Sequence, residues 1–363
     1  MTEPAATGFA AGSAATTDLV VEAVRSALEA AGSDFAHSIL LLLTSHYARH
    51  AQPAVTAAGR TARCLQVAGC TVSGVFTERR WALDQPAAAA LVLTGNISLG
   101  QASQTLPQLT FCRHEQAQPS WISPGPTRMG TLASGEQDGA AGAIWGHGKL
   151  LTQGRFEGSF SGARVRTELS RGMRMISAPL ALGDHDRHEI FQLNGRPALQ
   201  TLTQGLPLAG PLPLTHLFAA VLDPDCPSAD AATQGRYTLL PILGVNPDER
   251  SVTLAAVLPS DARLCWALRD TDVAVGEVRN AVSQMAMETQ RSPAFGLMFS
   301  CIGRGPFFYD GEDCDLAAVI QQFPGLPLIG AYGAGEIGPQ AEGNTLYSYS
   351  SVLSLVTPDV QSH

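Results

Sequence analysis

One order of predicted elements occurs twice in the chain, and this repetition restricts the possible folds more than any other feature of the sequence. In both copies, an apolar periodicity typical of a helix is followed by a buried strand, a second helix, a strand that enters a glycine turn, and a final strand. The first copy comprises residues 18–31, 39–43, 47–63, 65–74 and 88–93. The second copy comprises residues 272–290, 294–301, 315–323, 326–336 and 347–356. If both copies fold alike, the two glycine turns lie at equivalent edges and can face one cleft.

The residues between the two copies complete the predicted organisation. Residues 142–270 contain mostly short strand patterns bounded by glycine, and residues 204–215 contain three prolines, as linkers often do. We therefore predict an α/β (α+β) fold of two similar halves, each with a mixed β-sheet covered by helices in a layered arrangement. The predicted parts are a flexible tail at residues 1–17, one domain at residues 18–210 and a second domain at residues 211–363.

The composition excludes several classes of protein. With 45% hydrophobic and 15% charged residues the chain can bury a core, which excludes wholesale disorder. Its net charge of −9 argues against a nucleic-acid groove, which needs clustered Lys and Arg. No apolar run reaches the roughly 18 residues of a membrane helix, and the N-terminus has neither the basic start nor the apolar core of a secretory signal. The 7 scattered cysteines include no CxxC pair and indicate reduced thiols, so we expect a cytoplasmic protein.

The common catalytic and metal-binding templates are missing from the sequence. It has no GxSxG, GxxxxGKS/T, HExxH or SxxK motif. The loop at residues 183–189 and the pair His46 and His50 carry side chains that can bind metals, but a solvated turn and ordinary histidines explain them more simply. We therefore predict no metal site.

The sharpest local feature is a cysteine and an arginine in a glycine-flanked loop. Cys301 ends the strand predicted at residues 294–301, and Arg304 follows three residues later. A nearby guanidinium favours a thiolate, and the carboxyl ends of strands are where open α/β sheets bind ligands. Three interpretations remain open: a buried structural cysteine beside a surface arginine, a pair that lines a ligand site, and a catalytic thiol.

Several motifs resemble those of a known family, the FIST-domain proteins. Residues 299–305, FSCIGRG, and residues 327–339, PLIGAYGAGEIGP, are similar to the family's F-S-C-x-G-R-G and P-x-x-G-x-y-x-x-G-E-I-G-P signatures. Residues 171–174, RGMR, are similar to the stretch that joins the two parts of the family's module. A weaker similarity covers residues 67–74, after which Val75 stands where the family tends to have an acidic residue. The resemblance covers most of the chain.

This resemblance implies a bacterial intracellular sensory module with an N-terminal and a C-terminal FIST part. Such modules are thought to bind small ligands, amino acids among the suggestions, and to signal to an output protein. Some bacterial members are described as haem proteins that sense nitric oxide. The chain shows no attached kinase, cyclase or F-box, so we expect an output protein such as a histidine kinase or a cyclase to act in trans.

The predicted ligand site combines two loops of the second half. We expect Arg304 to hold a carboxylate, Glu336 to hold an ammonium and Tyr332 to form a wall, an arrangement that suits a zwitterion such as an amino acid. The other candidate binding residues are Cys301, Gly335, Cys70, Ser73 and Arg174. One alternative is an enzyme that uses the Cys301 thiol. Another is a haem-based sensor whose iron ligand is one of His37, His46, His50, His147 and His216.

Overall fold

Most of the chain is described by the computed structural model, which covers residues 3–136, 141–206, 212–226, 228–288 and 291–359. The chain divides into two units. Unit 1 contains residues 1–170 and 277–363, and unit 2 contains residues 171–276. Unit 2 is therefore inserted into the sequence of unit 1. The predicted domain boundary at residue 210 lies outside the described residues.

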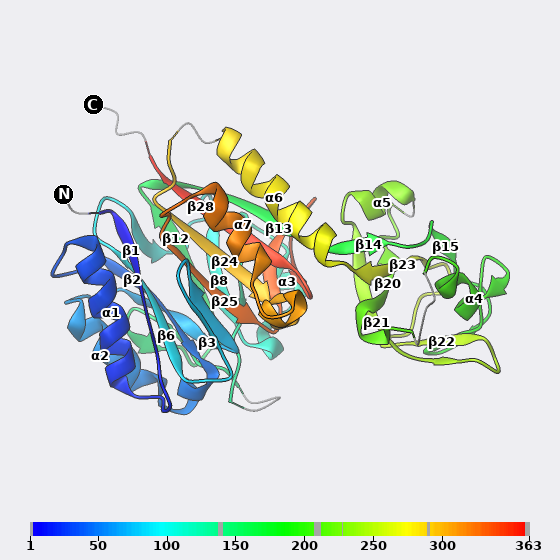
Figure 1. The fold of residues 1–363 in the computed structure, drawn as a ribbon, viewed down its shortest axis with the longest axis horizontal. Coiled ribbons are helices and arrows are strands. Elements are labelled where there is room, and N and C mark those ends of the chain that lie inside the picture. The colour runs from blue at the N-terminus through cyan, green and yellow to red at the C-terminus, as the bar shows by residue number, and fades with distance from the viewer. Residues whose placement is uncertain (1–2, 137–140, 207–211, 227, 289–290, 360–363) are drawn as a thin grey trace. The chain divides into compact units, whose positions relative to one another are not determined.

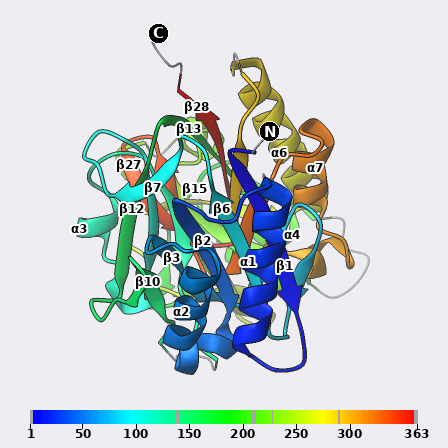
Figure 2. The ribbon, with the colours of Figure 1, turned by 90° about the vertical axis from the view of Figure 1, so that its left-hand side faces the viewer.

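Sheet 1 is formed mainly by the first copy of the repeated elements. Its strand order is β1-β6-β2-β3-β10-β11, and only β2 and β3 are parallel neighbours. The strands are β1 (Ala5–Ala11), β2 (Ser38–Thr44), β3 (Val67–Val72), β6 (Ala87–Leu93), β10 (Ile144–Gly146) and β11 (Lys149–Leu150). Helices α1 (Thr17–Ala31) and α2 (Ala51–Thr61) cover one face of this sheet (Figure 1; Figure 2). They do so because residues at helical spacing, such as Val20, Val24 and Ala27, form a buried apolar stripe.

Strand β1 corrects the prediction of a flexible tail at residues 1–17. Residues 5–11 pair along the whole of β6, and Gly8 lets helix α1 pack directly on the strand. A Cβ atom at Gly8 would lie 2.0 Å from the carbonyl oxygen of Ala23, so no larger residue fits there. The small residues that suggested disorder are therefore what this close contact requires.

Sheet 2 is formed mainly by the second copy. Its strand order is β13-β28-β24-β25-β4-β5, and β24 and β25 are its parallel pair. The strands are β13 (Ala163–Ser170), β28 (Ser351–Pro358), β24 (Phe295–Cys301), β25 (Leu328–Gly333), β4 (Gly74–Thr77) and β5 (Trp81–Leu83). Apolar residues of α6 (Thr271–Glu288) and α7 (Cys314–Gln322), including Val282 and Leu316, pack on one face of this sheet.

The two copies have the same topology, which confirms the predicted duplication. We call β1 to β6 the N-terminal repeat, and β13 together with residues 277–358 the C-terminal repeat. In each repeat the parallel pair is followed across the sheet by two antiparallel strands, β6 and β1 in one case and β28 and β13 in the other. The repeats differ at one connection. Residues 12–16 join β1 to α1, whereas residues 171–270 separate β13 from α6.

Sheet 3 completes the core of unit 1. Its strand order is β27-β26-β9-β8-β12-β7. The strands are β7 (Ser98–Gln101), β8 (Gln108–Cys112), β9 (Arg128–Leu132), β12 (Arg155–Ser161), β26 (Glu336–Gln340) and β27 (Gly343–Tyr347). Apolar residues of all three sheets form one buried cluster, in which the rings of Phe111 and Phe299 lie 5.8 Å apart. The predicted α/β class with mixed, helix-covered sheets is thus confirmed.

Unit 2 is built on an eight-stranded sheet of its own. The order is β14-β23-β20-β21-β22-β17-β16, and β15 also pairs with β23. The strands are β14 (Met173–Met175), β15 (Leu180–Ala181), β16 (His185–Asp186), β17 (Glu189–Ile190), β20 (Leu217–Leu222), β21 (Tyr237–Asn246), β22 (Ser251–Leu254) and β23 (Arg263–Arg269). A separate pair is formed by β18 (Gln192–Leu193) and β19 (Arg196–Pro197). Trp266 is buried in this unit and donates a hydrogen bond from Nε1 to Thr201 Oγ1 at 2.9 Å.

The remaining helices are short, and their bounds are α3 (Pro119–Ile122), α4 (Ala198–Thr203) and α5 (Ala229–Thr233). In the part of the chain that the structure describes, no helix combines the length and the apolar character needed to cross a membrane. Among the same residues, no group of three or more His, Cys, Asp or Glu side chains is placed to hold a metal ion.

Candidate functional site

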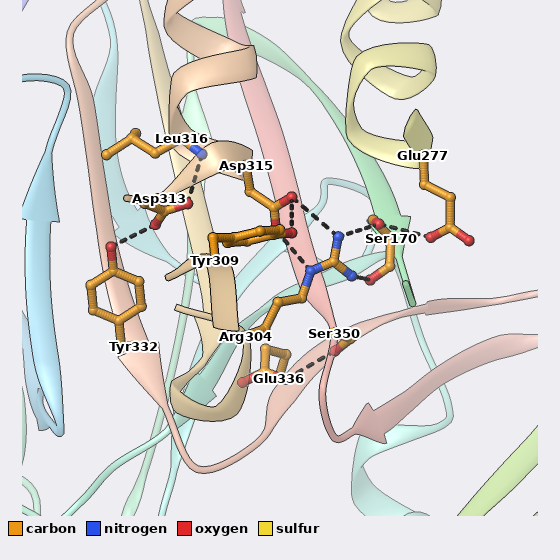
Figure 3. A network of polar contacts seen from close by, with 10 residues as sticks. All are labelled: Ser170, Glu277, Arg304, Tyr309, Asp313, Asp315, Leu316, Tyr332, Glu336 and Ser350. Carbon is orange, nitrogen blue, oxygen red and sulfur yellow. Dashed lines mark hydrogen bonds and ion pairs between the residues drawn. The ribbon is translucent and has the colours of Figure 1, made fainter. Parts of the chain in front are cut away.

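Arg304 lies at the centre of a buried polar network in the C-terminal repeat (Figure 3). The chain leaves β24 at Cys301 and passes through two short 3-10 helices, Ile302–Arg304 and Pro306–Tyr309, before α7. Arg304 is 1% exposed. Its Nε and Nη2 donate to the two carboxylate oxygens of Asp315 at 2.7 and 3.3 Å. Its Nη1 and Nη2 donate to the backbone oxygen and the hydroxyl of Ser170 at 2.9 and 2.6 Å.

The glycines on either side of Arg304 allow this loop to pack closely on two aromatic rings. A Cβ atom at Gly303 would lie 3.1 Å from the ring of Tyr349, and one at Gly305 would lie 3.0 Å from the ring of Tyr332. Contacts this short leave little room for a larger side chain. The G-R-G part of the motif therefore has a packing reason.

Two aspartates near the start of α7 complete the network around Arg304. Asp315 also accepts a hydrogen bond from the hydroxyl of Tyr309 at 2.7 Å. Asp313 is the N-cap of α7 and accepts from the backbone N–H of Leu316 at 2.9 Å and from the hydroxyl of Tyr332 at 2.6 Å. Burial, together with the charge of Asp315, raises the pKa of Asp313 from 3.8 to about 6. This carboxyl group can therefore change its protonation state close to neutral pH.

Glu336 is a further buried acid of the C-terminal repeat, and Figure 3 shows it with its hydrogen-bond partner Ser350. Its Oε2 accepts a hydrogen bond from the hydroxyl of Ser350 at 2.9 Å, whereas its Oε1 has no partner among the described residues. Complete burial raises the pKa of Glu336 well above its usual value, although Ser350 and the charge of Arg304 oppose the rise. Glu336 thus favours its protonated form and has one oxygen without a partner.

A row of polar side chains crosses sheet 2 at the end where Arg304 lies. Strand pairing places Tyr332, Ser300, Ser351 and Ser170 on successive strands, and each is at most 3% exposed. Ser170 also donates to Glu277 at 2.8 Å. The hydroxyls of Ser300 and Ser351 have no hydrogen-bond partner within the described part of the chain. Buried polar atoms without partners are rare in folded proteins, so these serines and Glu336 require an explanation.

The structure brings together the predicted site residues of the C-terminal repeat but not in the predicted arrangement. Cys301, Arg304, Tyr332, Gly335 and Glu336 all lie at or next to the ends of β24, β25 and β26. We predicted an open crevice between Arg304 and Glu336, and the structure corrects this, because both residues are buried. The guanidinium already has its carboxylate partner within the chain. A buried cation needs a counter-ion. Because Asp315 is that counter-ion, Arg304 does not need a carboxylate from a ligand.

The other three predicted residues have different surroundings. Cys70 lies in the central core, where burial and the neighbouring Cys112 raise the pKa of its thiol well above its usual value. Ser73 donates a weak hydrogen bond to Ser134 Oγ at 3.3 Å. Arg174 belongs to unit 2, where its half-exposed guanidinium donates to Asp270 at 2.7 Å. Each of these residues has local contacts that account for its position.

Sequence reasoning missed the aspartates and serines of the network. Asp313 could have been found from an N-cap signal, because it directly precedes α7, whereas we predicted that this helix begins at Asp315. Ser170, Ser300 and Ser351 carry no such signal. Only the pairing of three strands that are far apart in the sequence brings these serines together.

Comparison with known proteins supports the resemblance for the C-terminal part of the chain. Residues 199–339 match the model of the FIST C domain. An uncharacterized protein of Mycobacterium tuberculosis is 28% identical over 236 residues, which are 64% of this chain and 61% of that protein. An uncharacterized protein of Mycobacterium bovis is 28% identical over 260 residues, which are 71% of this chain and 66% of that protein. The chain thus spans less than two thirds of the length of each of these relatives.

The region matched by the family includes the network described above. It contains Cys301, Arg304, Tyr332 and Glu336, together with most of unit 2. The N-terminal FIST part stays a prediction. In residues 199–339 this chain is therefore similar to the FIST C domain.

Proposed function

We propose that this protein is a sensor of a small amine, with amino acids as the first class to test, and that Glu336 binds the protonated amino group. We further propose that the bound state signals to a separate output protein such as a histidine kinase or a cyclase. The sensory association of the FIST C domain supports the general role. As in the predicted site, Glu336 binds the ammonium group. Arg304 no longer binds a ligand carboxylate, because its guanidinium is paired with Asp315.

The unpaired Oε1 atom of Glu336 is the observation that carries this proposal. Leaving a buried polar atom without a partner costs about 1–3 kcal/mol. An ammonium group has three N–H donors and would supply the missing hydrogen bond. Its positive charge would also favour the ionised carboxylate, which burial alone disfavours.

In this proposal Arg304 is a positioning residue that keeps the loop between β24 and α7 closed. Its contacts to Asp315 and Ser170 fix the loop to α7 and to β13. Opening this loop would separate Arg304 from those partners and would expose Glu336 at the end of the sheet. Ligand binding and the position of α7 are therefore coupled.

Calorimetry of the full chain tests the proposed amine site. We would titrate amino acids, the corresponding amines without a carboxylate, and the corresponding acids without an amine. Heat is expected from the amines and amino acids only, and Glu336→Gln should abolish it because an amide does not form an ion pair. Glu157→Gln is the matched control, since it removes an ion pair with Arg128 on sheet 3 and should leave binding unchanged. Absence of heat from every amine would contradict the proposal.

Proton release gives a second, independent measurement. Before binding, burial favours the protonated carboxyl of Glu336, whereas the bound ammonium favours the carboxylate. Amine binding should therefore release up to one proton, and its affinity should increase as the pH rises. Titrations in two buffers of different ionisation enthalpy measure the released protons. Equal heats in both buffers would show that Glu336 is not the group that pairs with the amine.

The same purified protein tests the haem and thiol hypotheses, which stay predictions. A Soret band after expression with added haem would favour the haem-based sensor. Alkylation of Cys301 faster than that of a free thiol would favour the enzyme, and slow alkylation would agree with its 6% exposure.

A further inference from the structure

The chain passes between its two units twice, after Ser170 and before Glu277. We call residues 170–172 and 274–277 the two connecting segments. The hydroxyl of Ser170 donates to the carboxylate of Glu277 at 2.8 Å, so the last residue before unit 2 is bonded to the first residue after it. We propose that this contact, held in place by Arg304, fastens both connecting segments at once, and that its loss loosens them together.

Figure 3 shows Ser170 between Arg304 and Glu277. Nη2 of Arg304 donates to the hydroxyl oxygen of Ser170 at 2.6 Å, which leaves the hydroxyl hydrogen for Glu277. Nη1 of Arg304 donates to the backbone oxygen of Ser170 at 2.9 Å. Hydrogen bonds to charged groups are stronger than those between neutral groups, and Ser170 is only 3% exposed. The network therefore holds the end of β13 firmly beside Glu277 of α6.

Unit 2 holds the same two parts of the chain together by contacts of its own. The N–H of Asp270, which directly precedes α6, donates to the backbone oxygen of Gly172 at 3.2 Å. The neighbouring strands β14 and β23 pair with each other. Only Arg171 and residues 271–276 lie between the contact in unit 1 and the contact in unit 2. Hinges in proteins are short stretches of this kind.

Each connecting segment contains a glycine. Gly172 has a φ of 63°, in the left-handed region that favours this residue. Gly276 lies inside α6, where a Cβ atom would meet no other atom within 4 Å. Alanine would therefore fit at position 276, and it favours a helix more than glycine does. Because packing does not require this glycine, its effect is to weaken α6 next to Glu277, as expected for a hinge.

The N-terminal repeat, which has no inserted unit, has no hydroxyl at the position equivalent to Ser170. Strand pairing aligns Ala10 of β1 with Ser170 of β13. Three residues after the first parallel strand, Tyr47 takes the place of Arg304. The polar contacts thus occur in the repeat that has two connecting segments to hold, which supports their role in holding them.

The contact also links the proposed amine site to the connecting segments. Opening of the loop between β24 and α7 would withdraw Arg304 from Ser170. The contact between Ser170 and Glu277 would then lose the guanidinium that holds it, so both connecting segments would loosen. This link, unlike the contact itself, rests on the proposed function.

Hydrogen–deuterium exchange of the full chain, measured by mass spectrometry, tests the contact without any ligand. Ser170→Ala removes the shared hydroxyl, so the amides of residues 274–278 should exchange roughly five- to thirtyfold faster, although they lie more than a hundred residues away in the sequence. Glu277→Ala should accelerate exchange of residues 168–175 in the same way. Ser300→Ala is the matched control, because it removes a serine of the same row and should change neither segment.

A second variant tests the hinge without removing any contact of the network. Gly276→Ala should slow exchange of residues 274–278 roughly two- to fivefold, because alanine stabilises the helix at a position where it fits. An added amine should accelerate exchange in both connecting segments of the wild type but not of Glu336→Gln. If the amine has no such effect while the variants behave as expected, only the link to the proposed function fails.

Three results would overturn the proposal. One is that Ser170→Ala changes exchange only near residue 170 and leaves residues 274–278 as in the wild type. Another is that Tyr47→Phe, which removes a hydrogen bond from the equivalent loop of the N-terminal repeat, accelerates exchange in both connecting segments as much as Ser170→Ala does. The third is that Gly276→Ala leaves the exchange of residues 274–278 unchanged, because α6 would then not bend at this position.

Discussion

The two repeats of unit 1 place different side chains on equivalent strands. Residue pairing aligns β2, β3, β6 and β1 with β24, β25, β28 and β13. The row at the end of the parallel strands of the N-terminal repeat consists of Thr71, Leu43, Ala88 and Ala10. The equivalent row of the C-terminal repeat consists of Tyr332, Ser300, Ser351 and Ser170. One backbone plan thus carries a mainly apolar row in one copy and a polar row in the other.

The loops that follow the first parallel strand differ in the same way. Three residues after that strand, the N-terminal repeat buries Tyr47, whereas the C-terminal repeat buries Arg304. Tyr47 donates to the backbone oxygen of Thr16 at 2.9 Å, and burial raises its pKa to about 12, so it remains neutral. Arg304 requires the opposite charge of Asp315. The N-terminal repeat shows that this backbone plan does not need a buried charge at this position.

Removing the buried cation should produce the largest difference between the repeats. Arg304→Ala leaves Asp315 buried without a counter-ion and should lower the free energy of unfolding by about 3–5 kcal/mol. At the equivalent position of the N-terminal repeat, Tyr47→Phe removes one hydrogen bond and should cost about 1 kcal/mol. Urea denaturation measures both values. Equal costs would show that the Arg304–Asp315 pair is not the main difference between the loops.

The apolar row should respond strongly to loss of volume. Leu43→Ala removes a fully buried side chain between sheet 1 and its helices and should cost about 2–5 kcal/mol. The same urea experiment measures this cost. If the loss were below about 1 kcal/mol, the row of the N-terminal repeat would not be a tightly packed layer, and the comparison with the polar row would fail.

The N-caps of the two equivalent helices differ. Asp313 accepts a cap hydrogen bond at the start of α7, whereas His50 makes no side-chain cap bond at the start of α2. Only the C-terminal repeat should therefore have a cap whose protonation changes the stability. The pKa of Asp313 in the folded protein is about 6, above its ordinary 3.8, so the folded state binds the proton more tightly. Its contribution is therefore complete at low pH and decreases as the pH rises from about 4 to about 6, by up to about 3 kcal/mol.

The change Asp313→Asn isolates this contribution, because asparagine is also a good N-cap. The difference in unfolding free energy between wild type and variant should shift against the wild type across this pH range. Other carboxylates contribute equally to both proteins and cancel. A difference that stays constant from pH 4 to pH 7 would show that Asp313 titrates normally.

The repeats were predictable from sequence because apolar periodicity is a local property. The strand pattern at residues 39–43 and the helical stripe at residues 18–31 each indicate, without reference to any other part of the chain, which of their residues are buried. The polar row was not predictable, since Ser170, Ser300 and Ser351 meet only through strand pairing over long sequence distances. Residues 5–11 were missed for the opposite reason, because small residues that fit tightly under a helix resemble the composition of a flexible tail.

The smallest expected effect comes from Ser300, one of the two serines of the polar row without a hydrogen-bond partner among the described residues. Ser300→Ala removes a buried hydroxyl that has no partner among the described residues, so it should change the unfolding free energy by less than about 1 kcal/mol or stabilise the protein. Ser170→Ala is the matched control, because it removes contacts to Arg304 and Glu277 and should cost about 1–3 kcal/mol. Urea denaturation without added ligand measures both changes. A loss for Ser300→Ala as large as that for Ser170→Ala would mean that the hydroxyl of Ser300 has a partner in solution, such as a retained ligand, and mass spectrometry of the native protein would then identify it.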